Sequence, residues 1–325
     1  MMSDAPGQPR DELVRACQAL VESGNDAALL SSTANVTYAS AWEVPIPLGA
    51  GAEMSWGQPL LLVMAREQTA ILIVPAGDET SARSAARVDA VIPFDGFDSF
   101  KPTDSRQSFL SAVQHALREA GMLGGSGTLA VEGRTLPLAV GALLATDLTG
   151  WTFADAEAPL NVARSVKTPR EIGLLRQAAR LGGVAQQTLT ALCREAGPDE
   201  FAMFGQISAA VFAAAGRDIP LTGELVTGPR ATTVEYPNGP RQRQPVAGDV
   251  ALMDLSGRAN GYWFDCTNTN LVGDVAPDET QLRYAQASRE ACEPAMAALR
   301  PGALASDAAA AAEAAFARYD LPMAH

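Results

Sequence analysis

The stretch GDVALMDLSGRANGYWFDCTNTNLVG, residues 248–273, contains short apolar runs on both sides of an Asn-Gly pair. Asn-Gly favours tight turns between antiparallel strands, which predicts a hairpin with Arg258 to Gly261 as a four-residue loop. Asp254 and Asp265 lie eleven positions apart in this stretch. With that loop as the centre, the two carboxylates are predicted to lie directly opposite each other on one sheet face, with Cβ atoms about 5 Å apart.

Two opposed carboxylates in apolar surroundings indicate a metal site. Like charges at this distance destabilise a sheet unless a cation lies between them. Carboxylate oxygens suit divalent manganese, cobalt, iron or zinc, and two such ions can share bridging carboxylates and activate a water. The alternative is that both side chains are solvated in an ordinary hairpin, and a bare pair of Asp residues leaves it open.

The rest of the sequence predicts two domains, an α/β domain followed by an α+β domain. Its 325 residues exceed the usual size of one domain. Residues 1–160 alternate short apolar strands with amphipathic helices, a pattern typical of helices packed over a sheet. A long helix is predicted after Thr168, with Pro169 in its first turn and Glu171 closing a capping box. Residues 161–325 then contain helices and strands, with the boundary expected near residue 160.

Composition restricts the partners and the compartment. The chain carries 24 basic and 37 acidic residues, a formal charge of −13, which disfavours nucleic acid and anionic membranes as partners. It shows no signal-peptide core and no apolar run of about 18 residues. Its four cysteines lack the short spacings of zinc sites and the density of disulfide scaffolds. A cytoplasmic protein is therefore expected.

Several segments resemble one known family. GDVALMDLSGRANGYWFDCTNT resembles the signature of the pita-bread metallopeptidases, which include methionine aminopeptidase, prolidase and Xaa-Pro aminopeptidase and extend to the metal-free creatinase. RSVKTPREIGLLRQAARL (164–181) resembles the helix that opens the family's catalytic domain, and LRPGALASD (299–307) resembles a later turn into a helix. LVESGNDAALLSSTANVTYASAWE (20–43) resembles the creatinase-type amino-terminal α/β domain. The resemblance implies such a domain over 1–160 and an incomplete pita-bread domain over 161–325.

The resemblance also implies the site. Asp254 and Asp265 match the first two ligands of two divalent metal ions, and a His and two Glu are expected to follow. The ligand His normally lies shortly after the helix that ends here near Tyr319, and the chain stops at LPMAH. The chain is therefore expected to be truncated before the remaining ligands, with the catalytic Glu beyond residue 325. His325 either matches a His that contacts substrate or is a disordered terminal residue.

Two positions depart from the proline-specific members. Glu235 stands seven residues after Gly228, where those members place a substrate-facing His, and Asn268 stands where many members carry Arg. The segment 228–241 is interpreted either as presenting Arg230, Glu235 and Tyr236 to a different polar substrate or as a solvated loop. The other histidine, His115, is expected on a helix surface.

The leading hypothesis is a metal-dependent, Xaa-Pro peptidase-like hydrolase of peptide or amide bonds with metal-activated water as the nucleophile. The 325-residue chain itself is expected to be inactive. The alternatives are a creatinase-like hydrolase or lyase of a small metabolite, which Glu235 and Asn268 favour, and a non-catalytic pseudoenzyme. The resemblance implies a small peptide or amide as the substrate and a homodimer as the assembly.

Overall fold

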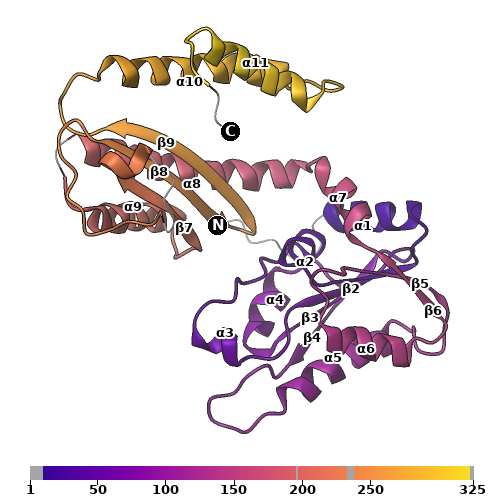
Figure 1. Cartoon of the computed structure of the whole chain (residues 1–325). Helices are drawn as coiled ribbons and strands as arrows, with labels where there is room; N and C mark the ends of the chain where they lie inside the picture. Colours follow the sequence, from indigo (N-terminus) through magenta and orange to yellow (C-terminus); the bar gives the residue numbers. More distant parts are fainter. Residues whose placement is uncertain (1–9, 195–196, 233–237, 323–325) are drawn as a thin grey trace. The chain divides into compact units, whose positions relative to one another are not determined.

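A computed structural model describes residues 10–194, 197–232 and 238–322 and divides the chain into two compact units (Figure 1). The first unit runs to Arg180 and also contains Gly257–Phe264. The second contains Leu181–Ser256 and the chain from Asp265 onward. The domain boundary near residue 160 stays a prediction, because the units are defined by contacts and helix α8 runs through both.

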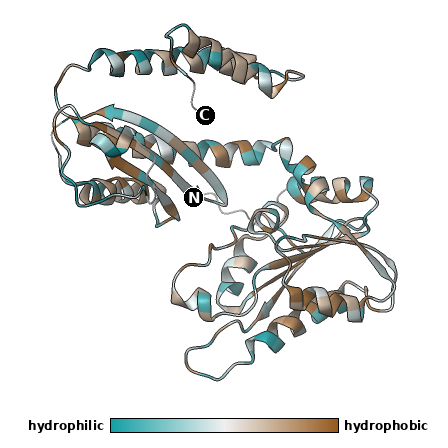
Figure 2. Ribbon diagram, in the orientation of Figure 1, coloured by the Kyte–Doolittle hydropathy of each residue, from teal (hydrophilic) through white to brown (hydrophobic). Residues whose placement is uncertain are grey.

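The first unit is built around a six-stranded mixed sheet. β1 pairs antiparallel with β2 and β2 with β3, whereas β1–β5, β3–β4 and β5–β6 are parallel. These strands are short and apolar, and Figure 2 shows them largely as hydrophobic. Across the sheet the order is β4 (Ala90–Phe94), β3 (Thr69–Pro75), β2 (Leu60–Met64), β1 (Ala27–Leu30), β5 (Gly127–Val131) and β6 (Trp151–Asp155).

Helices cover both faces of this sheet, so the strands are buried on two sides. Along β1, Ala28 and Leu30 belong to one core and Ala27 and Leu29 to the other, because successive side chains of a strand point to opposite faces. The first core is closed by α1 (Asp11–Glu22), α2 (Thr33–Ser40), α4 (Glu79–Ala85) and α7 (Glu157–Ser165). The second is closed by α5 (Ser105–Glu119) and α6 (Leu138–Asp147). The predicted α/β domain is confirmed.

The predicted start of the long helix α8 (Pro169–Cys193) is confirmed in detail. The Glu171 carboxylate accepts from the Thr168 backbone N–H at 2.7 Å, and the Glu171 N–H donates to the Thr168 hydroxyl at 3.1 Å. This is a reciprocal capping box. The Thr168 hydroxyl also donates to Glu12 of α1 at 2.6 Å, and all three side chains are buried. The cap therefore joins the first and last helices of the first unit.

The second unit contains helices and a three-stranded sheet of order β7-β8-β9, as predicted for an α+β domain. Its two carboxy-terminal helices, α10 and α11, pack side by side (Figure 1). Within the described residues no helix is long and apolar enough to cross a membrane. The elements are α9 (Glu200–Ala215), β7 (Leu221–Thr227), η2 (Gly228–Thr232), β8 (Val250–Ala259), β9 (Tyr262–Leu271), α10 (Glu279–Ala298) and α11 (Ala305–Ala317). Two short elements, α3 (Ala50–Met54) and η1 (Ala76–Asp78), belong to the first unit.

Candidate metal centre

The β8–β9 hairpin closes with two residues, so the predicted four-residue loop was wrong. β8 ends at Ala259 and β9 begins at Tyr262. The two turn residues have positive φ, 52° at Asn260 and 82° at Gly261. Asn and Gly tolerate this conformation, and a two-residue turn of this kind matches the natural twist of the strands. The register is therefore shifted by two residues from the predicted one.

Ser256, rather than Asp254, lies across from Asp265. The Ser256 hydroxyl donates to the Asp265 carboxylate at 2.9 Å, which supports this register. Asp254 then opposes Thr267, and because side chains alternate along a strand, Asp254 and Asp265 remain on one face as diagonal neighbours. Diagonal positions of an antiparallel pair lie about 7–8 Å apart. The carboxylates thus share a face, as predicted, at a wider spacing.

This face of the hairpin is the accessible one. Met253, Leu255 and Phe264 on the opposite face are buried, whereas Asp254 is partly exposed and Asp265 is exposed. Figure 2 shows β9 as hydrophilic along much of its length. On the covered face, the Gln186 side chain of α8 donates to the Cys266 carbonyl at 3.0 Å. The two carboxylates are therefore open to ions and water.

The donor set of the two Asp residues fits divalent ions, but only in part. In residues 10–194, 197–232 and 238–322, neither carboxylate forms an ion pair with Lys, Arg or His. The same residues contain no group of three or more His, Cys, Asp and Glu side chains that could hold a metal. Carboxylate oxygens suit hard and borderline divalent cations. Two such ligands leave most coordination positions to other groups.

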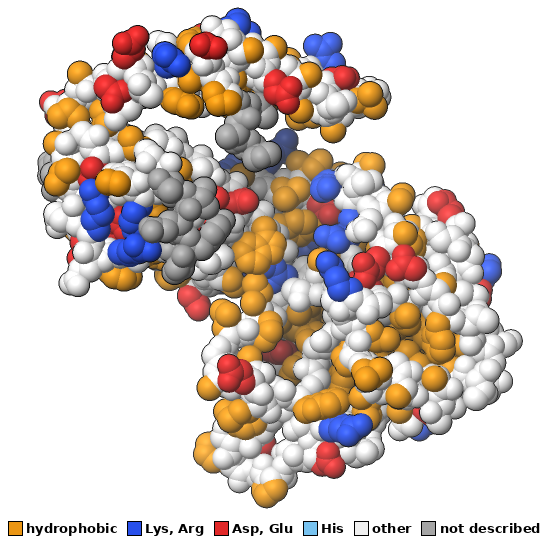
Figure 3. All heavy atoms as spheres, in the orientation of Figure 1, with side chains coloured by type: hydrophobic (Ala, Val, Ile, Leu, Met, Phe, Trp, Pro, Cys, Tyr) orange, Lys and Arg blue, Asp and Glu red, His pale blue; other side chains and the backbone are white. Residues whose placement is uncertain are grey.

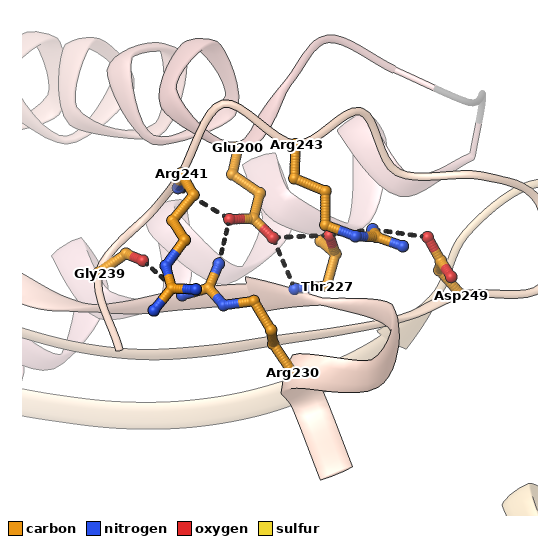
Figure 4. Close-up of polar contacts among 7 residues, drawn as sticks. All are labelled: Glu200, Thr227, Arg230, Gly239, Arg241, Arg243 and Asp249. Atoms are coloured by element: carbon orange, nitrogen blue, oxygen red, sulfur yellow. Dashed lines mark hydrogen bonds and ion pairs between the residues drawn. The ribbon is translucent and has the colours of Figure 1, made fainter. Parts of the chain in front are cut away.

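A buried carboxylate organises the segment that follows β7, where Figure 3 shows basic side chains near α9 and the sequence supplies arginines. Glu200, the first residue of α9, is fully buried. Its carboxylate accepts from the Thr227 N–H at 2.8 Å, the Thr227 hydroxyl at 2.7 Å, Arg230 Nη1 at 2.6 Å and the Arg241 N–H at 2.8 Å (Figure 4). Arg230 also donates to the Gly239 carbonyl at 2.8 Å. The guanidinium of Arg230 therefore links the Glu200 carboxylate at the start of α9 to the Gly239 carbonyl.

A second ion pair continues the same network. Arg243 Nη1 donates to Asp249 Oδ2 at 2.8 Å (Figure 4). The same oxygen also accepts from the Val246 N–H at 2.8 Å. Burial raises the pKa of Asp249, but the Arg243 hydrogen bond, the Val246 N–H and the Arg243 charge outweigh it and leave the pKa below 3.8. Gly228 has a φ of 60°, and a Cβ there would lie 2.7 Å from Asp249 Oδ1. A side chain at position 228 would therefore have to displace the Arg243 and Asp249 side chains.

The structure places the remaining candidates as follows. Glu235, Tyr236 and His325 lie outside the described residues. Asn268 is exposed on β9, where its side-chain oxygen accepts from the Thr269 N–H at 2.9 Å. His115 lies on the exposed side of α5, 3.1 Å from Glu119, which confirms the expected surface position. The substrate role of Arg230 stays a prediction, since its side chain is held by Glu200 and is 12% exposed.

Sequence reasoning missed Glu200, Arg243 and Asp249. Glu200 follows the capping residue Asp199, so in the sequence it is indistinguishable from an ordinary acidic residue in a first helical turn. A local signal is the presence of three arginines, Arg230, Arg241 and Arg243, in one short segment.

Comparison with known families accounts for nearly the whole chain. The model of the Creatinase/Prolidase N-terminal domain matches residues 13–166, and the model of Metallopeptidase family M24 matches residues 173–325. Residues 173–325 are therefore similar to metallopeptidase family M24, and residues 13–166 are similar to the amino-terminal domain of creatinases and prolidases. The predicted resemblance to the pita-bread metallopeptidases is thereby confirmed.

Individual relatives are distant. The putative dipeptidase YkvY of Bacillus subtilis (strain 168) is 30% identical over 172 residues, which cover 51% of this chain and 46% of that protein. The chain thus matches less than half the length of this curated relative.

Solved structures share the M24 fold. A prolidase from Pyrococcus horikoshii OT3 is 18% identical with a TM-score of 0.71, and the match covers 95% of this chain and 78% of the prolidase chain. The Xaa-Pro dipeptidase from Bacillus anthracis is 17% identical with a TM-score of 0.69, and the match covers 95% of this chain and 77% of the dipeptidase chain. The dipeptidase PepE from Mycobacterium ulcerans is 22% identical with a TM-score of 0.66, and the match covers 95% of this chain and 76% of the PepE chain. These likenesses confirm the fold.

Proposed function

We propose that this chain forms the amino-terminal domain and part of the catalytic domain of a metal-dependent hydrolase that cleaves short peptides. The observation that carries the proposal is the pair Asp254 and Asp265, which share the accessible face of the β8–β9 hairpin within the residues that match the M24 model. Prolidases and dipeptidases among the structural neighbours support a peptide substrate.

Asp254 and Asp265 would hold two divalent ions, of manganese, cobalt, iron or zinc. Such ions, when bound, lower the pKa of a water so that it can attack a carbonyl. Two carboxylates alone leave an ion weakly held, so the proposed site needs ligands in addition to Asp254 and Asp265. The Ser256 hydroxyl, which donates to Asp265, would orient that carboxylate. We expect the 325-residue chain by itself to be inactive.

The proposed substrate type is Xaa-Pro, with one competing candidate. Glu235 stands where proline-specific members carry a substrate-facing His, and Asn268 stands where many carry Arg. A carboxylate at that position would favour a substrate with a cationic or strongly hydrogen-bonding group. These two residues support a small-metabolite hydrolase or lyase as the alternative. The proposed assembly is a homodimer.

The test compares the 325-residue chain with a version extended by the coding sequence that follows it. Elemental analysis should find about two divalent ions per chain in the extended form and fewer in the shorter one. The extended form is assayed on Xaa-Pro dipeptides, on dipeptides without proline and on small amides. Preference for one class assigns the substrate, and metal binding without any hydrolysis would indicate a pseudoenzyme.

Two variants of the extended form test whether hydrolysis depends on Asp254 itself or changes when any acidic side chain is lost. Asp254→Asn should abolish hydrolysis and reduce the bound metal. Asp274→Asn is the matched control, because Asp274 is exposed just after β9 and outside the proposed site. Activity that survives Asp254→Asn unchanged would rule out the proposed ligand role.

A further inference from the structure

The first unit contains a pocket of about 480 Å³. Neither Asp254 nor Asp265 lines it. It is lined by the start of α2, by the junction of α7 and α8, and by the hairpin tip. Its size is typical of small-molecule sites. The lining residues that matter here are Thr33, Arg164, Lys167, Glu171, Tyr262 and Trp263.

The wall formed by the hairpin tip is held in place by buried contacts. Arg258 is 2% exposed and donates to the Val44 carbonyl at 2.6 Å and to the Thr37 hydroxyl at 3.0 Å. The Tyr262 hydroxyl donates to the Glu171 carboxylate at 3.2 Å. Gly261, with a φ of 82°, approaches Thr37 so closely that a Cβ would lie 2.5 Å from its methyl group. The pocket is therefore preformed.

Two cations in this pocket bind only neutral groups. Arg164 donates to the Asn35 side-chain oxygen at 3.1 Å, and Lys167 donates to the Ser165 carbonyl at 3.3 Å. Across the part of the chain that the structure describes, neither forms an ion pair with a carboxylate. In a chain with a net charge of −13, acidic partners are abundant. Two such cations in one concavity therefore indicate an anionic ligand.

The single acidic residue of the lining, Glu171, limits how much negative charge the ligand carries. Its carboxylate already accepts from the Thr168 N–H and the Tyr262 hydroxyl. Its charge disfavours a phosphate dianion more than a monoanion. Tyr262 and the half-exposed Trp263 offer apolar ring surface beside the cations. The lining thus suits one anionic group attached to an apolar body.

We propose that this pocket binds a small carboxylate-bearing molecule. Its carboxylate is held by Arg164 and Lys167, and its apolar part contacts Tyr262 and Trp263. An arginine fork and a lysine amine both form charge-assisted hydrogen bonds to carboxylate oxygens. The site does not depend on the proposed peptidase reaction.

The chain is suited to a direct test because Lys101 and Lys167 are its two lysines, and both are exposed. The 325-residue protein is treated with an amine-acetylating reagent, and mass spectrometry measures the acetylation rate of each lysine. The probe is N-acetyl-leucine, and its neutral amide is the control ligand. N-acetyl-leucine should slow acetylation of Lys167 about fivefold or more at saturation and leave Lys101 unchanged, and the amide should protect neither.

Calorimetric titration with N-acetyl-leucine checks the same site by affinity. Lys167→Gln and Arg164→Gln should each raise Kd about tenfold, the usual effect of losing one charge-assisted hydrogen bond. Lys101→Gln is the matched control and should leave Kd unchanged, and circular dichroism verifies that all variants are folded. Absence of saturable binding, equal binding of the amide, or equal effects of both lysine variants would overturn the proposal. Stronger protection of Lys167 by inorganic phosphate than by N-acetyl-leucine would also overturn it, in favour of a phosphate site.

Discussion

At the scale of single residues, Glu200 shows how one buried carboxylate can order a segment of the chain. It accepts hydrogen bonds from Thr227, Arg230 and Arg241, which lie 27 to 41 positions away in the sequence. A carboxylate that loses its charge in such a site leaves a buried cation without its partner, which is strongly destabilising. The stability of the segment between β7 and β8 therefore depends on a residue outside it.

Glu200→Gln is expected to lower the free energy of unfolding by about 2–4 kcal/mol. The amide keeps the shape of the side chain but brings an N–H donor toward the Thr227 and Arg230 donors. Urea unfolding followed by circular dichroism measures the change. Glu279→Gln is the matched control, since Glu279 is also the first residue of a helix that follows a capping Asp but is exposed. It should change stability by no more than about 0.5 kcal/mol, and equal effects of the two variants would contradict the role of Glu200.

The Arg243–Asp249 pair predicts a pH dependence of stability. Asp249 has a folded-state pKa below its ordinary value of 3.8, because hydrogen bonds from Arg243 and Val246 outweigh its burial. A lowered pKa contributes stability above the unfolded value, and that contribution is lost as the pH falls through the folded value. The stability difference between wild type and Asp249→Asn should be large at about pH 6 and shrink at about pH 3. A difference that stays constant across this range in urea unfolding would contradict the assignment.

At the scale of elements, the hairpin turn sets the positions of the two Asp residues. Asn260 and Gly261 both adopt positive φ, so β8 and β9 pair up to Ala259 and Tyr262. This register places Ser256 beside Asp265 and moves Asp254 one diagonal step away. A change of the turn that shifted the register by one residue would send one carboxylate to the covered face.

Gly261→Ala is expected to destabilise the first unit by about 1–3 kcal/mol. An added Cβ is strained at a φ of 82° and would collide with the Thr37 methyl group. Thermal or urea unfolding measures the loss. Gly133→Ala is the control, because Gly133 has no atom near the added Cβ and no positive φ. Equal stability of wild type and Gly261→Ala would show that the turn is not under this constraint.

At the scale of the whole molecule, the first unit is discontinuous in sequence. Its compact set of contacts includes Gly257–Phe264 as well as the chain up to Arg180. Within it Arg258 contacts Val44 and Thr37, more than 200 positions away. A segment of the sequence that matches the M24 model thus completes the first unit.

A fragment ending at Arg180 is expected to leave α2 less protected than it is in the 325-residue chain. The fragment lacks Arg258 and Gly261, so the Thr37 side of α2 loses its contacts with the hairpin tip. Hydrogen–deuterium exchange of α2 measures the difference, and α5 in the other core is the internal reference because it should exchange alike in both proteins. The fragment should also bind no metal stoichiometrically, because it lacks Asp254 and Asp265. Unchanged protection of α2 would contradict the contribution of the tip.

The sequence by itself determined the features that depend on near neighbours. The alternation of short apolar strands and amphipathic helices in residues 1–160 predicted the α/β domain, because each periodicity reflects a face buried against a core. Thr168 and Glu171 predicted the start of α8, since a capping box closes within four residues. The odd spacing of Asp254 and Asp265 determined that they share a face, which holds for either turn length.

The tertiary structure alone decided what depends on distant partners. The hairpin register was wrong in the prediction because both loop lengths suit an Asn-Gly pair, and only the strands' pairing chose the shorter one. The Glu200 network and the attachment of Arg258 to Val44 join residues that lie 27 to more than 200 positions apart. The residues adjacent in sequence do not indicate these distant partners. Folding brings the polar groups together in the core and excludes the water that would otherwise solvate them.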